Sequence, residues 1–206
     1  MINLYPNPNE KRERYYVFLD IDGTLIDEEY GKRVRGPFFS FGQNSVLKPE
    51  SIEALNILLA SLEQKYDTSL VITSGRRQNF SACVKHLHEQ GLVYDKWITC
   101  IPFEPGRRGQ KIVDHMMTKS QPKFPRLSKV INYLIGKYAD SGYTNYVVLE
   151  DNLKKIKYEI PPARRIMTNK HSQSLTIKQV ENYLKRNNIP IIEHESQADE
   201  SSFEKQ

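Results

Sequence analysis

Short apolar runs alternate with longer amphipathic segments along most of this chain. The runs lie at Tyr15–Leu19, 69–73, Trp97–Ile101, Tyr146–Leu149 and 163–168. Segments with apolar residues at helical spacing lie at 49–64, 78–90, 127–138 and 174–186. Apolar runs without polar alternation are typical of strands that are buried on both faces of a parallel sheet. The pattern therefore predicts regular alternation of strands and helices.

This alternation predicts an α/β fold with a doubly wound, Rossmann-like parallel sheet of about five strands. Right-handed crossovers place helices on both faces of such a sheet, and ligands bind at the carboxyl ends of its strands. Residues 104–121 are interpreted as a loop, and the polar, acidic end of the chain as a tail or linker. We expect a single domain over residues 1–188 and a tail over 189–206.

Composition narrows the class of protein. With 206 residues, 38% of them hydrophobic, the chain suffices for one core, and it has no apolar run of the ~20 residues that span a bilayer. The start, MINLYPNPNEKRER, lacks the apolar stretch of a signal peptide, so we expect a protein of the reducing cytoplasm. Cys83 and Cys100 are expected to be reduced packing residues. A net charge of +5 suits an anionic substrate but equally an ordinary mixed-charge surface.

Two carboxylates follow the first apolar run, in the segment DIDGTL. Asp20 and Asp22 would repel each other at a sheet edge unless a hard divalent cation such as Mg2+ neutralised them. Asp20 could then attack phosphorus as a carboxylate nucleophile, while Asp22 protonates the leaving oxygen and later activates water. Gly23 permits the tight turn that this arrangement requires.

The segment DIDGTL resembles DxDGT, the first motif of the haloacid dehalogenase (HAD) superfamily. The resemblance implies a magnesium-dependent phosphatase that forms an aspartyl-phosphate intermediate. It also implies a second motif in TSGRR, where Ser74 and the backbone at Gly75 would hold the transferring phosphate. Thr73 is expected to point to the opposite face of the sheet. Arg76 and Arg77 are interpreted as surface or structural ion pairs rather than substrate ligands.

The remaining motifs supply a lysine and further carboxylates. Lys123, in PKFP, is similar to the lysine that neutralises the cluster in this family, and Lys119 and Lys111 are the alternatives. The acidic fourth motif matches Glu150 and Asp151. Asp151 is expected to bind Mg2+ and Glu150 to orient a bound water. The predicted metal site thus draws on residues from two strand ends, namely Asp20, Asp22, Glu150 and Asp151.

Large cap domains of the family are inserted after the first or second motif, and both insertions are short here. A core without a large cap leaves an open site, so we expect a phosphorylated macromolecule as substrate, foremost a phosphotyrosine protein. Phe38, Phe39 and Phe41 could line the site or instead pin a flap to the core, while Arg107 and Arg108 could bind substrate. Some capless relatives are effectors of intracellular bacteria, so delivery into a host cell is a further hypothesis.

Three alternatives stay open at this point. A nucleic acid end phosphatase would be consistent with the net positive charge of the chain and with the basic segment GRRGQK. A small-metabolite phosphatase would also use the same four motifs. A phosphoacceptor module similar to a receiver domain would cluster acidic residues without being an enzyme. Asp22 favours an enzyme, because an acceptor needs no general acid two residues further on.

Overall fold

A computed structural model describes residues 12–42, 44–103, 106–120 and 145–192 of the protein. These residues form a five-stranded sheet in the order β3-β2-β1-β4-β5, in which every pairing is parallel. The strands are β1 (Arg14–Leu19), β2 (Asp67–Ile72), β3 (Ile98–Cys100), β4 (Tyr146–Glu150) and β5 (Arg165–Met167). The predicted α/β sheet and its five strands are confirmed.

The central strands are apolar because helices cover both of their faces. Every residue of β4 is buried, and Val17, Phe18 and Leu19 of β1 are fully buried. Val17 and Leu19 belong to one core cluster, whereas Phe18 points to the other face and belongs to a second cluster. A continuous apolar run is thus what a strand needs when it contributes to two cores at once.

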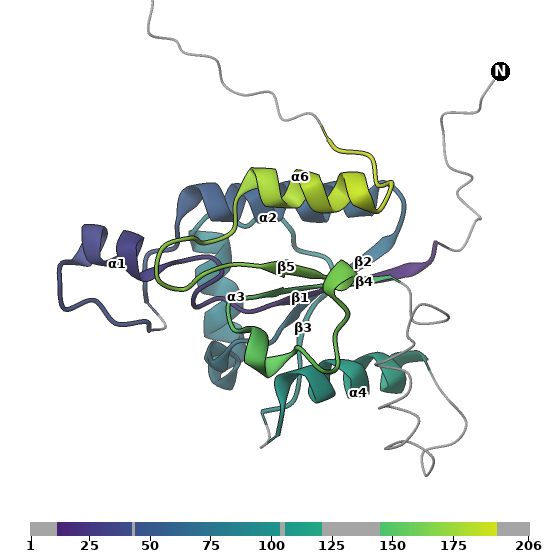
Figure 1. Ribbon diagram of the computed structural model, residues 1–206, viewed down its shortest axis with the longest axis horizontal. Coiled ribbons are helices and arrows are strands. Elements are labelled where there is room, and N and C mark those ends of the chain that lie inside the picture. Colours follow the sequence, from purple (N-terminus) through teal and green to yellow (C-terminus); the bar gives the residue numbers. More distant parts are fainter. Residues whose placement is uncertain (1–11, 43, 104–105, 121–144, 193–206) are drawn as a thin grey trace, which may run out of the picture.

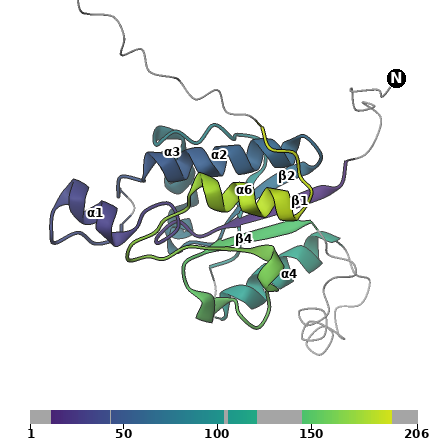
Figure 2. The same ribbon diagram turned by 45° about the horizontal axis from the view of Figure 1, so that its top comes forward.

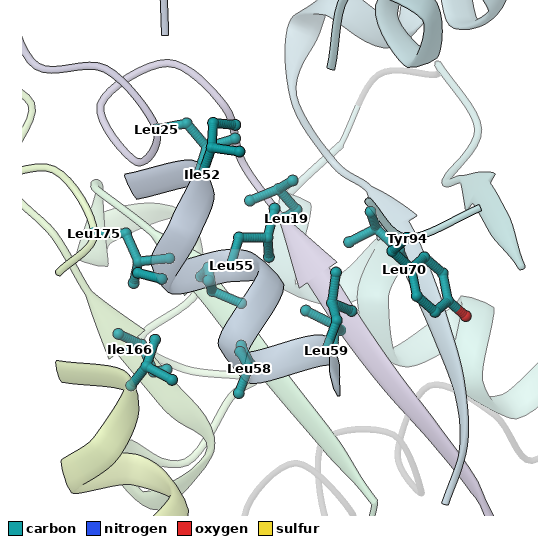
Figure 3. Close-up of a cluster of buried hydrophobic side chains, with 14 of the residues drawn as sticks. Leu19, Leu25, Ile52, Leu55, Leu58, Leu59, Leu70, Tyr94, Ile166 and Leu175 are labelled. Carbon is teal, nitrogen blue, oxygen red and sulfur yellow. The ribbon is translucent and has the colours of Figure 1, made fainter. Parts of the chain in front are cut away.

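The helices are α1 (Glu28–Arg35), α2 (Pro49–Glu63), α3 (Phe80–Glu89), α4 (Arg108–Ser120) and α6 (Ile177–Arg186). Helices α2 and α6 lie side by side over one face of the sheet, and α4 lies on the opposite face (Figure 1, Figure 2). Figure 3 shows how α2 fills the larger core, where its leucines approach Leu19 of β1, Leu70 of β2 and Ile166 of β5. Helices therefore cover both faces of the sheet.

Local sequence signals set where two of these helices begin. Pro49 occupies the first turn of α2, where a missing N–H costs nothing. Thr176 and Gln179 form a capping box at the start of α6, so each side chain satisfies a backbone N–H of the first turn. Both helices were predicted close to their observed bounds. The helix predicted over 127–138 lies outside the described residues.

The interpretation of residues 104–121 as a loop is wrong, because α4 occupies Arg108–Ser120. Ile112, Val113 and Met116 of this helix are buried against the second face of the sheet. Their spacing places them on one side of a helix, which is the signal that the interpretation missed. The remaining positions of the segment are largely polar and charged, which explains its loop-like composition.

A small flap connects β1 to α2. In the described residues it holds only α1 and a loop, so no large cap domain is inserted there. The Phe39 ring packs on Gly31, where a Cβ would lie 2.3 Å from the ring, and it meets the Phe41 ring edge-on at 5.2 Å. These two phenylalanines pin the flap to the core, whereas Phe38 is 97% exposed.

Two further properties concern the cysteines and the helices. Both cysteines are free, and burial raises the pKa of the Cys83 thiol to about 11, which suits a packing residue rather than a nucleophile. None of the helices in the described part of the chain has the length and apolar character to cross a bilayer.

Candidate active site

The site lies where the winding of the sheet changes direction. From β1 the chain proceeds outward to β2 and β3, whereas β4 and β5 extend the sheet on the other side of β1. The strand order therefore reverses between β1 and β4, and the connections that follow these two strands lead to opposite sides of the sheet. Ligands of doubly wound sheets bind at such a switch point. Asp20 follows β1 there, and Glu150 and Asp151 lie at the end of β4. Carboxylate oxygens of these three residues lie within 4.8 Å of one another.

Two cations compensate the negative charge of this cluster. Arg108, at the start of α4, donates from Nη1 to both Asp20 and Glu150. Lys155 Nζ lies 3.6 Å from Asp20 Oδ2, 3.4 Å from Glu150 Oε1 and 3.8 Å from Asp151 Oδ1. Because all three carboxylates are nearly buried, without these cations their mutual repulsion would be expensive.

The two buried acids differ in their readiness to ionise. Burial disfavours the charged form of Asp20, but the positive charges of Arg108 and Lys155 outweigh burial, so the pKa of Asp20 lies below its usual value. Burial and the neighbouring charge of Asp20 raise the pKa of Glu150 to about 8. Asp20 is thus ionised at neutral pH, as a carboxylate nucleophile must be.

The three carboxylates fit a divalent cation. Asp151 Oδ1 is buried and has no hydrogen-bond partner among the described residues, which leaves a buried acceptor available for a ligand. An all-oxygen set of this kind suits Mg2+ rather than a softer metal. Asp20, Glu150 and Asp151 would hold the ion, and when bound it would offset the charge of a phosphate group brought against Asp20.

Asp22 is not part of this carboxylate group. Its Oδ1 accepts hydrogen bonds from Arg76 Nε at 3.1 Å and from Arg76 Nη2 at 2.5 Å. The Arg76 side chain is 4% exposed, whereas that of Asp22 remains 31% exposed. A buried arginine thus fixes a carboxylate that solvent and substrate can still reach. Asp22 therefore lies outside the group that could hold a metal ion, and its expected role as a metal ligand is not supported.

The end of β2 positions the predicted phosphate-binding residues. Leu19 pairs with Ile72, so the residues after β1 and β2 emerge side by side. Ser74 is fully buried, and its Oγ accepts a 3.4 Å hydrogen bond from Arg76 N, while space is open beside Gly75. Arg77 braces this turn by donating to the backbone oxygens of Thr73 and Ser74. Ser74 therefore serves as a cap in the described structure, and its contact with phosphate remains a prediction.

Gly23 is required where the chain turns between the two aspartates and the flap. Its φ is +83°, and a Cβ would lie 2.4 Å from Asp151 Oδ2. Thr168, just after β5, donates from Oγ1 to Gly23 O at 2.8 Å and holds the turn from the other side. The turn after β1 thus packs directly against the carboxylate that ends β4.

Gly23→Ala is expected to destabilise the protein by about 1–3 kcal/mol, since it strains the backbone. It is also expected to lower the predicted phosphatase activity by about 100-fold, since it displaces Asp151. Gly36→Ala is the matched control, because Gly36 has a φ of +92° with nothing within 4 Å of an added Cβ. Thermal unfolding and phosphate release measure the two effects. Equal activity losses in both variants would contradict a specific contact between Gly23 and Asp151.

The other predicted residues lie around the cluster or outside the described part of the chain. Arg107 is exposed and pairs with Glu159 at 3.8 Å, whereas Arg108 reaches the carboxylates themselves. No contact with the cluster is seen for Lys111, whose Cε lies near Gly106. Lys123 and the side chain of Lys119 are not described.

Sequence reasoning missed one basic residue of the site. Lys155 was not considered, although it follows a strand end, the criterion by which the acidic residues were chosen. The ion pair expected for Arg76 is present, and its partner is Asp22. A search for basic residues close behind each apolar run would have pointed to Lys155.

Comparison with known proteins identifies the family. A model of the HAD domain in Swiss Army Knife RNA repair proteins matches residues 16–190, from within β1 to beyond α6. Searches of curated proteins and of solved structures each found no match. The matched range contains the whole carboxylate cluster together with Asp22, Ser74 and Lys155. The chain therefore belongs to the family of HAD domains in Swiss Army Knife RNA repair proteins, and so to the haloacid dehalogenase superfamily that the DIDGTL segment indicated.

Proposed function

We propose that this chain is a Mg2+-dependent phosphatase that removes a terminal phosphate group from RNA. Membership in the HAD family supports a phosphohydrolase-type function. The observation that carries the proposal is the convergence of Asp20, Glu150 and Asp151, with oxygens within 4.8 Å, at the switch point of the sheet. Arg108 and Lys155 face this cluster, and together with a bound divalent cation they would offset the charge of a phosphate group as well as that of the carboxylates.

The residues suggest a two-step reaction. A carboxylate oxygen of Asp20 attacks phosphorus, the bond from phosphorus to the ribose oxygen breaks, and Asp22 donates a proton to the departing oxygen. In the second step, Asp22 takes a proton from water as that water attacks phosphorus and releases Asp20 and inorganic phosphate. Arg76 holds Asp22 in place throughout. Bound Mg2+ would supply charge compensation for the phosphoryl group.

The preference for RNA over a phosphotyrosine protein rests on the family description. That description names RNA repair proteins, and it supports neither a phosphotyrosine substrate nor an effector delivered by a bacterium. The nucleic acid end phosphatase, an alternative at the level of the sequence, therefore becomes the leading hypothesis. The segment between β1 and α2 holds no large cap in the part of the chain that the structure describes, and a site without a lid would admit a polymer end.

A substrate panel tests this choice. The full chain is incubated with RNA oligonucleotides phosphorylated at the 3′ or 5′ end, a phosphotyrosine peptide, a phosphoserine peptide and a sugar phosphate, and released phosphate is measured. We expect the highest kcat/KM for one of the RNA ends. A higher value for the phosphotyrosine peptide would overturn the proposed substrate and leave the phosphatase assignment intact.

The neutralising lysine is a second point of the proposal, and we assign this role to Lys155 because its Nζ faces all three carboxylates. Lys155→Met is expected to lower kcat by about 100-fold, since one preorganised positive charge is lost. Lys123→Met is the comparison variant. A large loss in Lys123→Met together with normal activity in Lys155→Met would return the role to Lys123.

A further inference from the structure

Exposed apolar side chains follow two of the strand ends. Within the described residues, Phe103, Leu153 and Tyr158 are among the large hydrophobic side chains that are exposed. Phe103 follows β3, which pairs with β2, whereas Leu153 and Tyr158 follow β4, whose end carries Glu150 of the cluster. Phe103 is 57% exposed and Tyr158 is 64% exposed. Single exposed rings are common on protein surfaces, so exposure matters here only together with the charges beside each ring.

The Tyr158 ring lies next to two cations. Arg107 Cζ lies 5.4 Å from the ring centroid, and Lys157 Nζ lies 4.5 Å from it. Arg107 pairs with Glu159 and directly precedes Arg108, the first residue of α4, which contacts Asp20 and Glu150. The ring therefore lies beside the start of the helix that reaches the cluster.

Phe103 has a similar position on the side of β2. Arg77 Cζ lies 4.9 Å from its ring centroid, and the same guanidinium donates to Ser74 O at 2.6 Å. The ring is thus one side chain away from the predicted phosphate-binding turn. Both rings combine an exposed aromatic surface with a positive charge, which is the combination that single-stranded nucleic acids require for base stacking and phosphate neutralisation.

We infer that unpaired nucleotides next to the phosphorylated end of RNA stack on Tyr158 and Phe103, while Arg107 and Lys157 contact the adjoining phosphates. This inference rests on the proposed function, which places the terminal phosphate at Asp20. It adds a preference for single-stranded ends, because paired bases are stacked within a duplex and cannot reach the rings.

Binding of labelled RNA to the full chain tests this site. The Asp20→Asn protein is used so that no turnover occurs, and Kd is measured by fluorescence anisotropy for a phosphorylated single strand and for a flush-ended duplex. Tyr158→Leu and Phe103→Leu are each expected to raise the Kd for the single strand about tenfold, whereas Tyr158→Phe retains the affinity. Trp97→Leu is the matched control. Trp97 is 54% exposed and has Arg14 over its ring, but it precedes β3 and so lies at the amino ends of the strands, away from the site.

The outcomes separate this inference from the proposed function. In the active protein, Tyr158→Leu should lower the ratio of kcat/KM for single-stranded RNA to kcat/KM for p-nitrophenyl phosphate, and Trp97→Leu should not change it. Unchanged RNA affinity in both leucine variants, or a duplex bound as tightly as the single strand, would overturn the stacking site. A wild-type chain that hydrolyses p-nitrophenyl phosphate but no RNA end would instead overturn the proposed function. Loss of phosphotyrosine peptide binding in both leucine variants, with RNA binding intact, would assign the rings to a protein substrate.

Discussion

Asp20→Asn is expected to reduce kcat for phosphate release by about 10⁴-fold or more, because removal of an attacking nucleophile leaves only binding and electrostatic stabilisation. The amide is close in size to the carboxylate, so the fold should persist. Its loss of charge leaves Arg108 and Lys155 facing Glu150 and Asp151, which still compensate them. Initial rates with an RNA end and with p-nitrophenyl phosphate measure the effect, and both should fall together.

Asp67→Asn is the matched control for this variant. Asp67 is the first residue of β2 and so lies at the amino ends of the strands, away from the site. It pairs with Arg14 at 3.3 Å on the surface. An exposed pair of this kind contributes little to stability, and it has no role in the proposed chemistry. Activity of Asp20→Asn within tenfold of the Asp67→Asn protein would exclude Asp20 as the nucleophile.

Asp22→Asn is expected to cost about 10³-fold in kcat with an RNA end, because the ribose oxygen is a poor leaving group that needs a proton. With p-nitrophenyl phosphate the leaving group departs as a stable anion and needs no proton. The loss of kcat with this substrate should therefore be much smaller, provided that the attack on phosphorus limits the rate. Thermal unfolding serves as a control, since the neutral amide would weaken the pair with buried Arg76.

The dependence on leaving group distinguishes two roles for Asp22. A general acid predicts unequal losses with the two substrates. Equal losses would indicate that Asp22 acts by positioning Arg76 or the turn at Gly23, and would contradict its role in proton transfer. Partial recovery in Asp22→Glu would be consistent with the acid role, because a carboxylic acid is restored on a longer side chain.

Much of the fold could be predicted from the sequence because buried parallel strands have a distinctive composition. The runs ending at Leu19 and Leu149 are apolar at every position, and the strands extend to within a residue of the predicted bounds. The residues just beyond these ends then identified the carboxylate cluster, since parallel strands bring their carboxyl ends to one edge. Asp20, Glu150 and Asp151 do meet there.

What the sequence left undetermined depends on side chains that reach across the fold. Arg108 contacts Asp20 through a helix that was interpreted as a loop, and Lys155 bends back to the strand end that precedes it. Long basic side chains are common in this chain, and only packing decides which ones point into the site. The contact of Phe39 with Gly31 likewise depends on how the folded chain packs. The positions of the phenylalanines in the sequence could not show whether they pin the flap to the core or bind substrate.

The most direct test of the account is whether release of the terminal phosphate from single-stranded RNA depends on a divalent cation. The purified full chain is assayed with Mg2+, after treatment with EDTA, and after Mg2+ is restored. The account predicts phosphate release with Mg2+, its loss by at least about 100-fold in EDTA, and full recovery on restoring the ion. Release that continues undiminished in EDTA would contradict the claim that Asp20, Glu150 and Asp151 act around a bound cation.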